Sequence, residues 1–293
     1  MLLTITSQVK DFGRRPGYVP TMPTMTTPAG VGPLLRDWRQ QRHLSQLDLA
    51  STAEVSTKHL SFVETGRSKP SRELVLHLAE HLDVPLRERN TLLLAAGYAP
   101  VYQQTSLDAE EMTPVREALD RILQSHEPFP AIVVDRRWDL VAANAPALLI
   151  LTEGVAPGLL APPANALRVS LHPDGLGPRV RNLAAYGAHI LQRLHRQAVL
   201  NADDALDALG DELRSYPGVA DAVGGATPPD DPVSMLFVPL ELEFRGTTLT
   251  FFSTMSAFGT ALDITIAELS IESFFPADAE TAEALRHLAA AGA

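Results

Sequence analysis

The sequence contains no cysteine, no long apolar run and no basic, apolar segment at its start. The lack of cysteine excludes disulfides and metal or iron–sulfur sites built on thiolates, and it is typical of the reducing cytoplasm. No run of about 18 apolar residues is present, so the sequence predicts no membrane-spanning helix. Residues 1–6 carry no positive charge and no signal-peptide core. We therefore expect a cytoplasmic protein that does not enter a membrane.

Positive charge is also scarce, since the net charge is −11, but its distribution is uneven. Residues 31–103 carry nine Lys or Arg and eight Asp or Glu, whereas residues 104–293 carry 12 and 26. An acidic segment is repelled by the phosphates of nucleic acids. Any surface that lies on phosphates is therefore expected before residue 104.

Length and composition indicate about two folded domains. Residues 1–30 contain four prolines and show no periodicity, so we expect a disordered leader, and Met25 is a candidate for the native start. We assign residues 31–103 and 113–276 to two domains. Residues 277–293 are expected to form a C-terminal helix.

Residues 45–67 predict two short helices joined by a tight turn. Ser45 is a good N-cap, and Asp48 three residues later completes a capping box. Ser56 caps the second helix, and Gly66 follows its last turn, where glycine is common. Two helices that cross over such a turn form a helix-turn-helix, whose second helix enters the major groove of DNA.

Further helices are expected at residues 32–44, 70–82 and 86–96, which makes a five-helix bundle. Residues 31–97 resemble the lambda-repressor-like, XRE-type DNA-binding domain in the Ser-Gln start of helix two, the Glu-Thr-Gly-Arg end of helix three and the Pro-Ser start of helix four. Glu54 stands in the turn where that family usually has glycine. A positive φ at this residue costs about 1 kcal/mol, which is tolerable.

The resemblance implies which side chains face double-stranded DNA. The candidates on and before the second helix of the motif are Ser56, Thr57, Lys58, His59, Ser61 and Phe62. The candidates for phosphate contacts are Arg39, Gln46, Arg67 and Lys69. Lys58 would suit a guanine by hydrogen-bond geometry. The alternative is a solvated, charged helix that has no role in DNA binding.

Two histidine motifs are candidates for chemical sites. His77-Leu-Ala-Glu-His81 matches the inverted zinc-protease pattern, but it lies in the fourth helix of the bundle, where an exposed polar face is the simpler interpretation. His172 and Asp174 have no partnered nucleophile nearby in the sequence. We therefore expect no catalytic set, no metal site and no cofactor, and we do not expect an enzyme.

Alternating hydrophobic patterns in the second half of the chain predict β-strands. The expected strands cover residues 131–135, 138–142, 235–244, 247–256 and 264–274. Arg136–Arg137 and Arg245–Gly246 are the expected hairpin turns. The longest helix between the strands is expected from Pro178 to about Leu200. The predicted fold class is thus α plus α+β: a helical bundle followed by a PAS-like antiparallel sheet domain with helices on one face.

Three groups of segments in this half resemble the MmyB-like ligand-binding domain of transcription regulators. They are residues 134–144, residues 170–176 with Asn182, and residues 251–254 with 258–260 and 273–276. This resemblance implies a transcriptional regulator that senses a small apolar molecule, with fatty-acid-like ligands as the leading candidate. Since one helix-turn-helix contacts only a few base pairs, we also expect a homodimer.

Aromatic side chains are the expected lining of the ligand cavity. The candidates are Trp138, Tyr186, Phe237, Phe251, Phe252, Phe258 and Phe274. Arg168 and Arg181 are the candidates for contact with a ligand carboxylate. The alternative is that the aromatic residues only fill a core, because aromatic residues on strands usually do. In that case the second domain serves only dimerisation or the docking of a protein partner.

Overall fold

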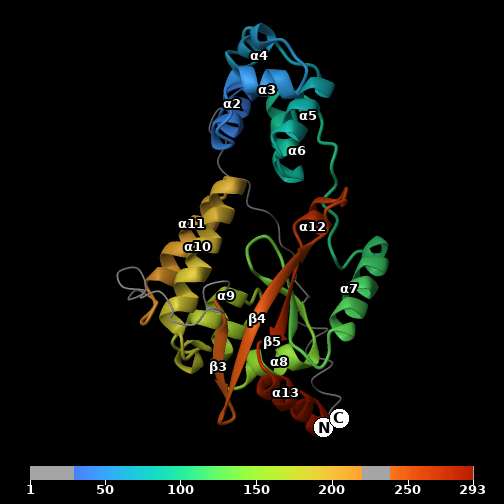
Figure 1. Cartoon of the computed structure of the whole chain (residues 1–293). Coiled ribbons are helices and arrows are strands. Elements are labelled where there is room, and N and C mark those ends of the chain that lie inside the picture. The colour runs from blue at the N-terminus through green and yellow to red at the C-terminus, as the bar shows by residue number, and fades with distance from the viewer. Residues whose placement is uncertain (1–29, 220–237, 293) are drawn as a thin grey trace.

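The computed structural model describes residues 30–219 and 238–292. A small helical unit sits on a larger unit built around a sheet (Figure 1). Residues 1–29 of the predicted leader, with Met25, and the ligand candidate Phe237 lie outside the described residues. None of the described helices is both long enough and apolar enough to cross a lipid bilayer.

The helical unit confirms the predicted bundle. Its helices are α2 (Val31–Gln41), α3 (Gln46–Thr52), α4 (Thr57–Glu64), α5 (Arg72–His81) and α6 (Leu86–Ala95). Ser45 and Asp48 form the predicted capping box, and Ser56 caps α4 by accepting a hydrogen bond from the amide of His59. Glu54 has a φ of 51°, so the turn adopts the left-handed conformation although it lacks glycine. The apolar faces of these helices meet in one core that includes Leu35, Leu49, Leu60, Leu78 and Leu93.

Five strands within the described residues form one antiparallel sheet in the order β2-β1-β5-β4-β3. They are β1 (Ala131–Val134), β2 (Leu140–Ala143), β3 (Leu240–Phe244), β4 (Thr247–Ala257) and β5 (Ser270–Pro276). Arg245 and Gly246 have φ values of 50° and 81°, which is the two-residue turn that suits the twist of a hairpin. The antiparallel α+β architecture of this unit is confirmed.

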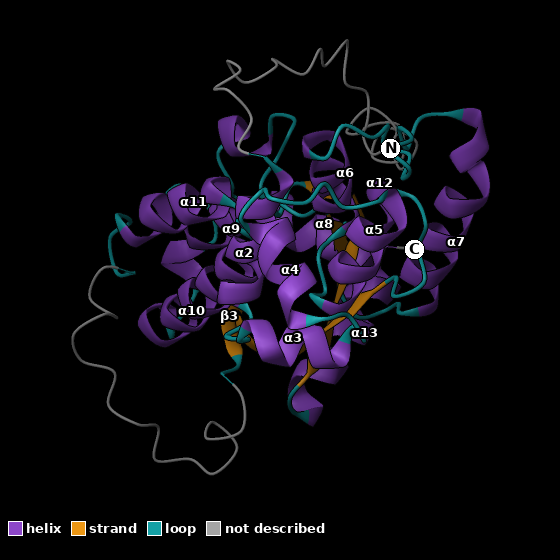
Figure 2. Cartoon of the chain, turned by 90° about the horizontal axis from the view of Figure 1, so that it is seen from above, coloured by secondary structure: helices purple, strands orange, loops and turns teal. Residues whose placement is uncertain are grey.

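Helices cover both faces of the sheet, and the expectation of one covered face was wrong. One face packs against α8 (Ala145–Thr152), α9 (Ala166–Leu171), α10 (Leu183–Asn201), α11 (Asp204–Arg214) and α13 (Ala279–Gly292). The other face packs against α7 (Thr113–Ser125). Figure 2 shows α10 and α11 on one side of the sheet and α7 on the other. On β1, Ile132 belongs to the first core and Val133 to the second, because successive side chains of a strand point to opposite faces.

The segment that begins at Ile264 is helical at first, although its alternating pattern predicted a strand. Asp263 caps the short helix α12 (Ile264–Ala267) by accepting a hydrogen bond from the amide of Thr265. The strand β5 begins only at Ser270. The N-cap at Asp263 favours a helical turn here, against the alternating pattern that predicted a strand.

The long helix begins at Leu183 and not at Pro178 as predicted. Val180 forms a β-bridge with Leu242, and the amide of Arg181 donates to the carbonyl of Glu241. The Asn182 side chain also bonds to the backbone beside β3. These bonds to the sheet use backbone groups that a helix would need.

Candidate functional site

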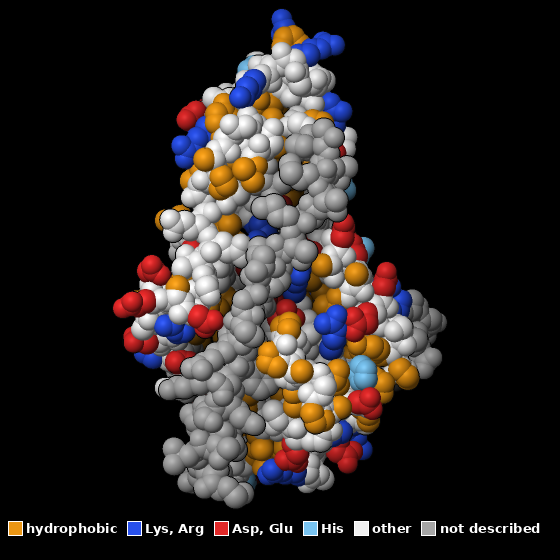
Figure 3. All heavy atoms as spheres, turned by 180° about the vertical axis from the view of Figure 1, so that it is seen from behind, with side chains coloured by type: hydrophobic (Ala, Val, Ile, Leu, Met, Phe, Trp, Pro, Cys, Tyr) orange, Lys and Arg blue, Asp and Glu red, His pale blue; other side chains and the backbone are white. Residues whose placement is uncertain are grey.

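Helix α4 lies at the end of the molecule that is farthest from the sheet (Figure 1). Leu60 and Val63 are buried in the helical core, so the opposite face of α4 is presented outward. Thr57, Lys58 and His59 are exposed on that face. Lys and Arg side chains gather at this tip of the molecule (Figure 3). The arrangement leaves an exposed helix face with positive charge around it.

The ring of Phe62 contacts two cationic side chains of this face. The Lys58 ammonium lies 5.7 Å from the centroid of its ring, and the Arg67 guanidinium lies 5.9 Å from it. Such contacts are weakly attractive and position charges without neutralising them. Ser61 and Phe62 are half-buried, while Arg67 and Lys69 are exposed.

Arg39 is buried, and its position is incompatible with the predicted phosphate contact. Its Nε and Nη2 atoms donate to the two carboxylate oxygens of Glu64 at 2.7 and 3.0 Å. Its Nη1 donates to the carbonyl of Leu44 at 2.7 Å. Only 8% of Arg39 is exposed, and the side chain of Glu64 is fully buried. The pair therefore joins α2 to α4 inside the core and is closed to a ligand.

The side-chain amide of Gln46 is hydrogen-bonded to the same carboxylate, that of Glu64. Its Nε2 donates to Glu64 at 2.7 Å. Burial by itself would raise the pKa of Glu64, but the hydrogen bonds from Arg39 and Gln46 outweigh it and hold the pKa below its ordinary value. Glu64 is thus a charged anchor of the helix-turn-helix.

The histidine side chains of both motifs form hydrogen bonds with backbone groups. The Nε2 atom of His77 lies 2.8 Å from the carbonyl of Ala53, and Nδ1 of His81 lies 2.9 Å from the carbonyl of His77. Nδ1 of His172 accepts a hydrogen bond from the amide of Asp174. Among the described residues, no three His, Asp or Glu side chains are placed to hold a metal ion.

A small cavity lies between α10 and the sheet, where the ligand site was predicted. It is lined by Tyr186, His189, Ile190, Arg193, Val238, Leu240, Phe251, Ser253, Glu272 and Phe274. Tyr186, Phe251 and Phe274 of the predicted lining therefore meet around it. Its volume is about 20 Å³, which is room for about one water molecule. An acyl chain would enter only if α10 and the sheet moved apart.

The remaining aromatic candidates lie elsewhere. Phe252 stacks on Phe275 with ring centroids 5.3 Å apart, and it cannot share the cavity of Phe251 because adjacent residues of a strand point to opposite faces. Phe258 packs against the core beneath α7. Trp138 is buried against α10, where its Nε1 donates to Gln197 at 2.9 Å.

Neither predicted arginine lines the cavity. Nε and Nη2 of Arg168 each donate a hydrogen bond of 2.7 Å to the Glu212 carboxylate, so this edge of the guanidinium is already engaged. Arg181 lies at the surface and donates to the hydroxyl of Thr248. Both side chains thus have other partners.

Arg193, which was not among the residues predicted from the sequence, is the arginine that lines the cavity. Its Nη1 donates to Glu272 at 3.0 Å, and its guanidinium lies 4.3 Å from the centroid of the Trp138 ring. The signal that could have found it is its spacing from Tyr186 and Ile190, which places all three on one face of α10.

Tyr186 supplies a polar group to the same cavity. Burial, with a smaller contribution from the charge of Glu272, raises the pKa of its hydroxyl well above the ordinary value. The hydroxyl therefore keeps its proton and can donate a hydrogen bond at neutral pH.

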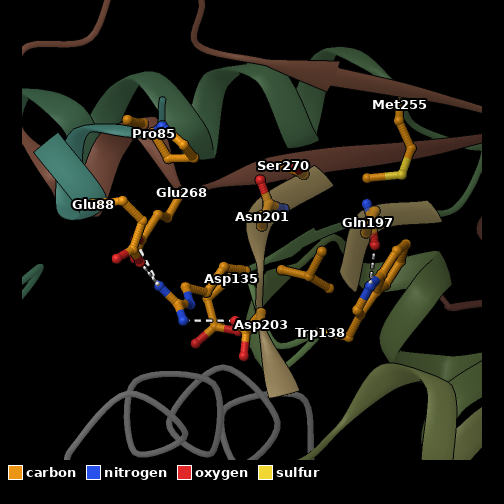
Figure 4. A pocket seen from close by; sticks show the side chains of 13 residues that line it. Pro85, Glu88, Asp135, Trp138, Gln197, Asn201, Asp203, Met255, Glu268 and Ser270 are labelled. Atoms are coloured by element: carbon orange, nitrogen blue, oxygen red, sulfur yellow. Dashed lines mark hydrogen bonds and ion pairs between the residues drawn. The ribbon is translucent and has the colours of Figure 1, made fainter. Parts of the chain in front are cut away.

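A larger cleft of about 170 Å³ lies where the helical unit meets the sheet unit. Pro85 and Glu88 of the helical unit line one side, and Trp138, Gln197, Asn201, Asp203 and Glu268 are among the residues that line the other (Figure 4). Arg136 crosses this cleft. Its Nη2 lies 2.6 Å from Asp203, and its Nη1 lies 3.4 Å from Glu268 and 3.8 Å from Glu88.

Direct bonds also connect the two units. Nε and Nη2 of Arg87 in α6 donate to the Glu268 carboxylate at 2.7 and 2.8 Å. The guanidinium of Arg42 donates to the carbonyl of Leu200 at the end of α10. Burial raises the pKa of Glu88 although Arg136 and Arg87 oppose this. The orientation of the helical unit thus depends on polar contacts with α10 and α12.

Comparison with known proteins gives two family matches. The family model of the MmyB-like transcription regulator ligand binding domain matches residues 115–288, and a helix-turn-helix model matches residues 35–89. HTH-type transcriptional regulatory proteins from Methanococcus maripaludis strains C5 and C7 are each 29% identical over 109 residues. These alignments cover 37% of this chain but only 30% of each relative.

Proposed function

Because the chain belongs to the family of MmyB-like transcription regulators, we propose that it binds double-stranded DNA as a homodimer and responds to a small apolar ligand. The observation that carries this proposal is a pairing of two sites. An exposed cationic face on α4 belongs to one core, and a cavity behind α10 belongs to another. The functional units are residues 31–103 and a ligand-binding unit that begins near residue 113. Leu285 of α13 packs in the core of the latter, so we extend this unit through α13.

The DNA-binding part of the proposal rests on exposure and charge. Thr57, Lys58 and His59 are exposed at the start of α4, the end that contacts base edges in a helix-turn-helix. Arg67 and Lys69 flank this surface and are free to approach phosphates. Two copies related by a twofold axis would contact half-sites about 34 Å apart or multiples of that distance.

The ligand-binding part rests on the apolar walls of the cavity. Tyr186, Phe251 and Phe274 surround it together with Ile190 and Leu240. Burial of an acyl chain among them would contribute about 0.8 kcal/mol per methylene group. Affinity should therefore rise with chain length until the opened cavity is full, and then fall.

One observation favours a second function for the sheet unit. A cavity of about 20 Å³ is the size of a core defect, and a unit with a filled core would serve dimerisation or partner docking only. The two functions differ in ligand response. A docking unit gives the same DNA affinity with and without acyl ligands, whereas a sensor does not.

Selection of binding sites from a random DNA library, with the full chain, tests the DNA-binding part. The expected result is a set of sites with twofold symmetry and half-sites one or more helical turns apart. Sedimentation of the protein, free and on a selected site, should give two copies. A strictly monomeric protein in both states would contradict the homodimer.

A further inference from the structure

Arg193 differs from three other glutamate-paired arginines of the described residues in how its guanidinium is used. Arg39, Arg87 and Arg168 each place a glutamate carboxylate on the edge formed by Nε and Nη2. This side-on arrangement gives two parallel hydrogen bonds to one carboxylate. Arg193 instead meets Glu272 with Nη1, at the end of the guanidinium.

The side-on edge of Arg193 is buried and meets no acceptor from residues 30–219 or 238–292. Its Nε and Nη2 atoms are buried, and neither has a hydrogen-bond partner among the residues that the structure describes. Buried donors without acceptors are costly, and the cost is higher for a charged group. Nη2 of Arg179 and Oε1 of Gln41 are also unpaired, but neither residue lines the cavity or the cleft.

The surroundings of Arg193 hold it in place. The guanidinium lies over the Trp138 ring, and Glu272 is fixed by the hydroxyl of Ser253, which donates to it at 2.9 Å. Arg193 lines the same cavity as Phe251 and Phe274. A cation with two spare donors thus stands beside apolar walls, which matches a molecule with an anionic head and an apolar body.

We propose that Arg193 is the residue that recognises the head of the ligand, by holding a carboxylate on its Nε–Nη2 edge. This inference rests on the proposed ligand-sensing function and assigns its specificity. The neutral hydroxyl of Tyr186, in the same cavity, is a further donor for the head. The ligand is then an acid with an apolar body, and its neutral ester is a poor substitute.

Arg193 also connects the cavity to the cleft between the two units. It contacts Trp138 and Met255, and both residues line the cleft (Figure 4). A carboxylate bound to the Nε–Nη2 edge of Arg193 therefore lies one side chain away from the cleft beside the DNA-binding unit. For this reason, the fluorescence of Trp138 should change when the head of the ligand binds Arg193.

The test compares acids with their methyl esters on the full chain. Calorimetric titrations would use octanoate, dodecanoate and hexadecanoate and the matched methyl esters. Wild type should prefer each acid to its ester by about tenfold to a hundredfold, the worth of hydrogen bonds to a charged group. Arg193→Met should bind the ester as wild type does and lose the preference for the acid. Arg181→Met, the same change at a surface position, should keep it.

Two further variants keep the test decisive if Arg193→Met folds poorly because Glu272 loses its partner. Arg193→Met with Glu272→Gln removes both charges together, and it should also lose the preference. Arg193→Lys keeps a charge for Glu272 but has no side-on edge, so it should keep only part of the preference.

Trp138 fluorescence gives a second readout. In a Trp38→Phe background, Trp138 is the only tryptophan, and its emission should change with dodecanoate but not with methyl dodecanoate. Equal affinity for acid and ester in wild type, or a full acid preference in both Arg193→Met and Arg193→Met with Glu272→Gln, would overturn the assignment of Arg193. Binding of neither acid nor ester would overturn the ligand-sensing function itself.

Discussion

The two units of this protein each contain a buried arginine–glutamate pair, and the pairs differ in how completely they are bonded. In the helical unit, the Arg39 side chain donates to both oxygens of Glu64 and to the carbonyl of Leu44. In the sheet unit, Arg193 donates to Glu272 with one nitrogen, and its two other buried nitrogens have no hydrogen-bond partner within the described part of the chain.

The difference separates a structural pair from a binding group. A fully bonded pair fixes two helices and has nothing to offer a ligand. A partly bonded guanidinium beside a cavity costs stability in the free protein, and a ligand that completes its bonds recovers that cost. The rigid pair lies in the unit that must present α4 unchanged to DNA, and the incomplete pair lies in the unit assigned to sensing.

The largest effect is expected from breaking the complete pair. Arg39→Met should lower the free energy of unfolding of the helical unit by about 3–5 kcal/mol, because the Glu64 charge is left buried. Arg193→Met should cost the sheet unit less, since it removes two unsatisfied donors along with the bond to Glu272. Urea unfolding would measure both, with Trp38 reporting the core of the helical unit and Trp138 the core of the sheet unit. Equal losses of unfolding free energy in the two variants would contradict the distinction between a complete and an incomplete pair.

The same pair predicts a pH dependence. The folded pKa of Glu64 lies below its ordinary value, so its contribution to stability is complete above the unfolded pKa, about 4.3, and is lost as the pH falls through the folded pKa. Wild type should therefore lose its advantage over Glu64→Gln as the pH drops below that range. Glu80→Gln, at an exposed position of α5, is the control and should run parallel to wild type. An unchanging gap between wild type and Glu64→Gln would refute the role given to Glu64.

Local signals in the sequence predicted the helical unit well and the sheet unit less well. The capping box at Ser45 and the hairpin turn at Arg245–Gly246 depend on neighbouring residues, so a short stretch of sequence contains them. Arg39 was placed on DNA because its partner Glu64 is 25 residues away, and only the fold brings them together. Arg193 was missed for the same reason, since Glu272 is 79 residues away.

On the surface of the helical unit, smaller effects should distinguish base contacts from phosphate contacts. Lys58→Ala should relax sequence preference at one position by about 1–3 kcal/mol. Arg67→Ala should weaken binding to all sequences alike and reduce the salt slope by about one. Binding to selected and scrambled sites over a range of salt concentrations measures both. Arg121→Ala in α7, an exposed position on the sheet unit, should change neither quantity. A base-specific loss in Arg67→Ala but not in Lys58→Ala would reverse the assignment of the two residues.

The smallest effect on stability is expected at the junction of the two units. Glu268→Gln weakens the bonds to Arg87, which are partly exposed, and should cost at most about 1 kcal/mol. It should nevertheless reduce the effect of an acyl ligand on DNA affinity, because this pair joins α6 to α12. Glu153→Gln, which weakens the pair with Arg245 on the distant hairpin, is the matched control. A full ligand effect in Glu268→Gln would show that coupling takes another route.

The central claim, that the sheet unit senses a ligand which changes DNA binding, is tested most directly by one titration. DNA binding would be measured with and without acyl acids of graded length, on wild type, Phe251→Glu and Phe252→Glu, with Trp38 emission confirming that the helical unit is folded. We predict that wild type responds most strongly at one chain length. Phe251→Glu should keep basal DNA binding but lose the response, and Phe252→Glu, on the opposite face of β4, should keep both. A wild-type protein that binds DNA equally well with every chain length and with none would contradict the claim and leave dimerisation or docking as the role of the sheet unit.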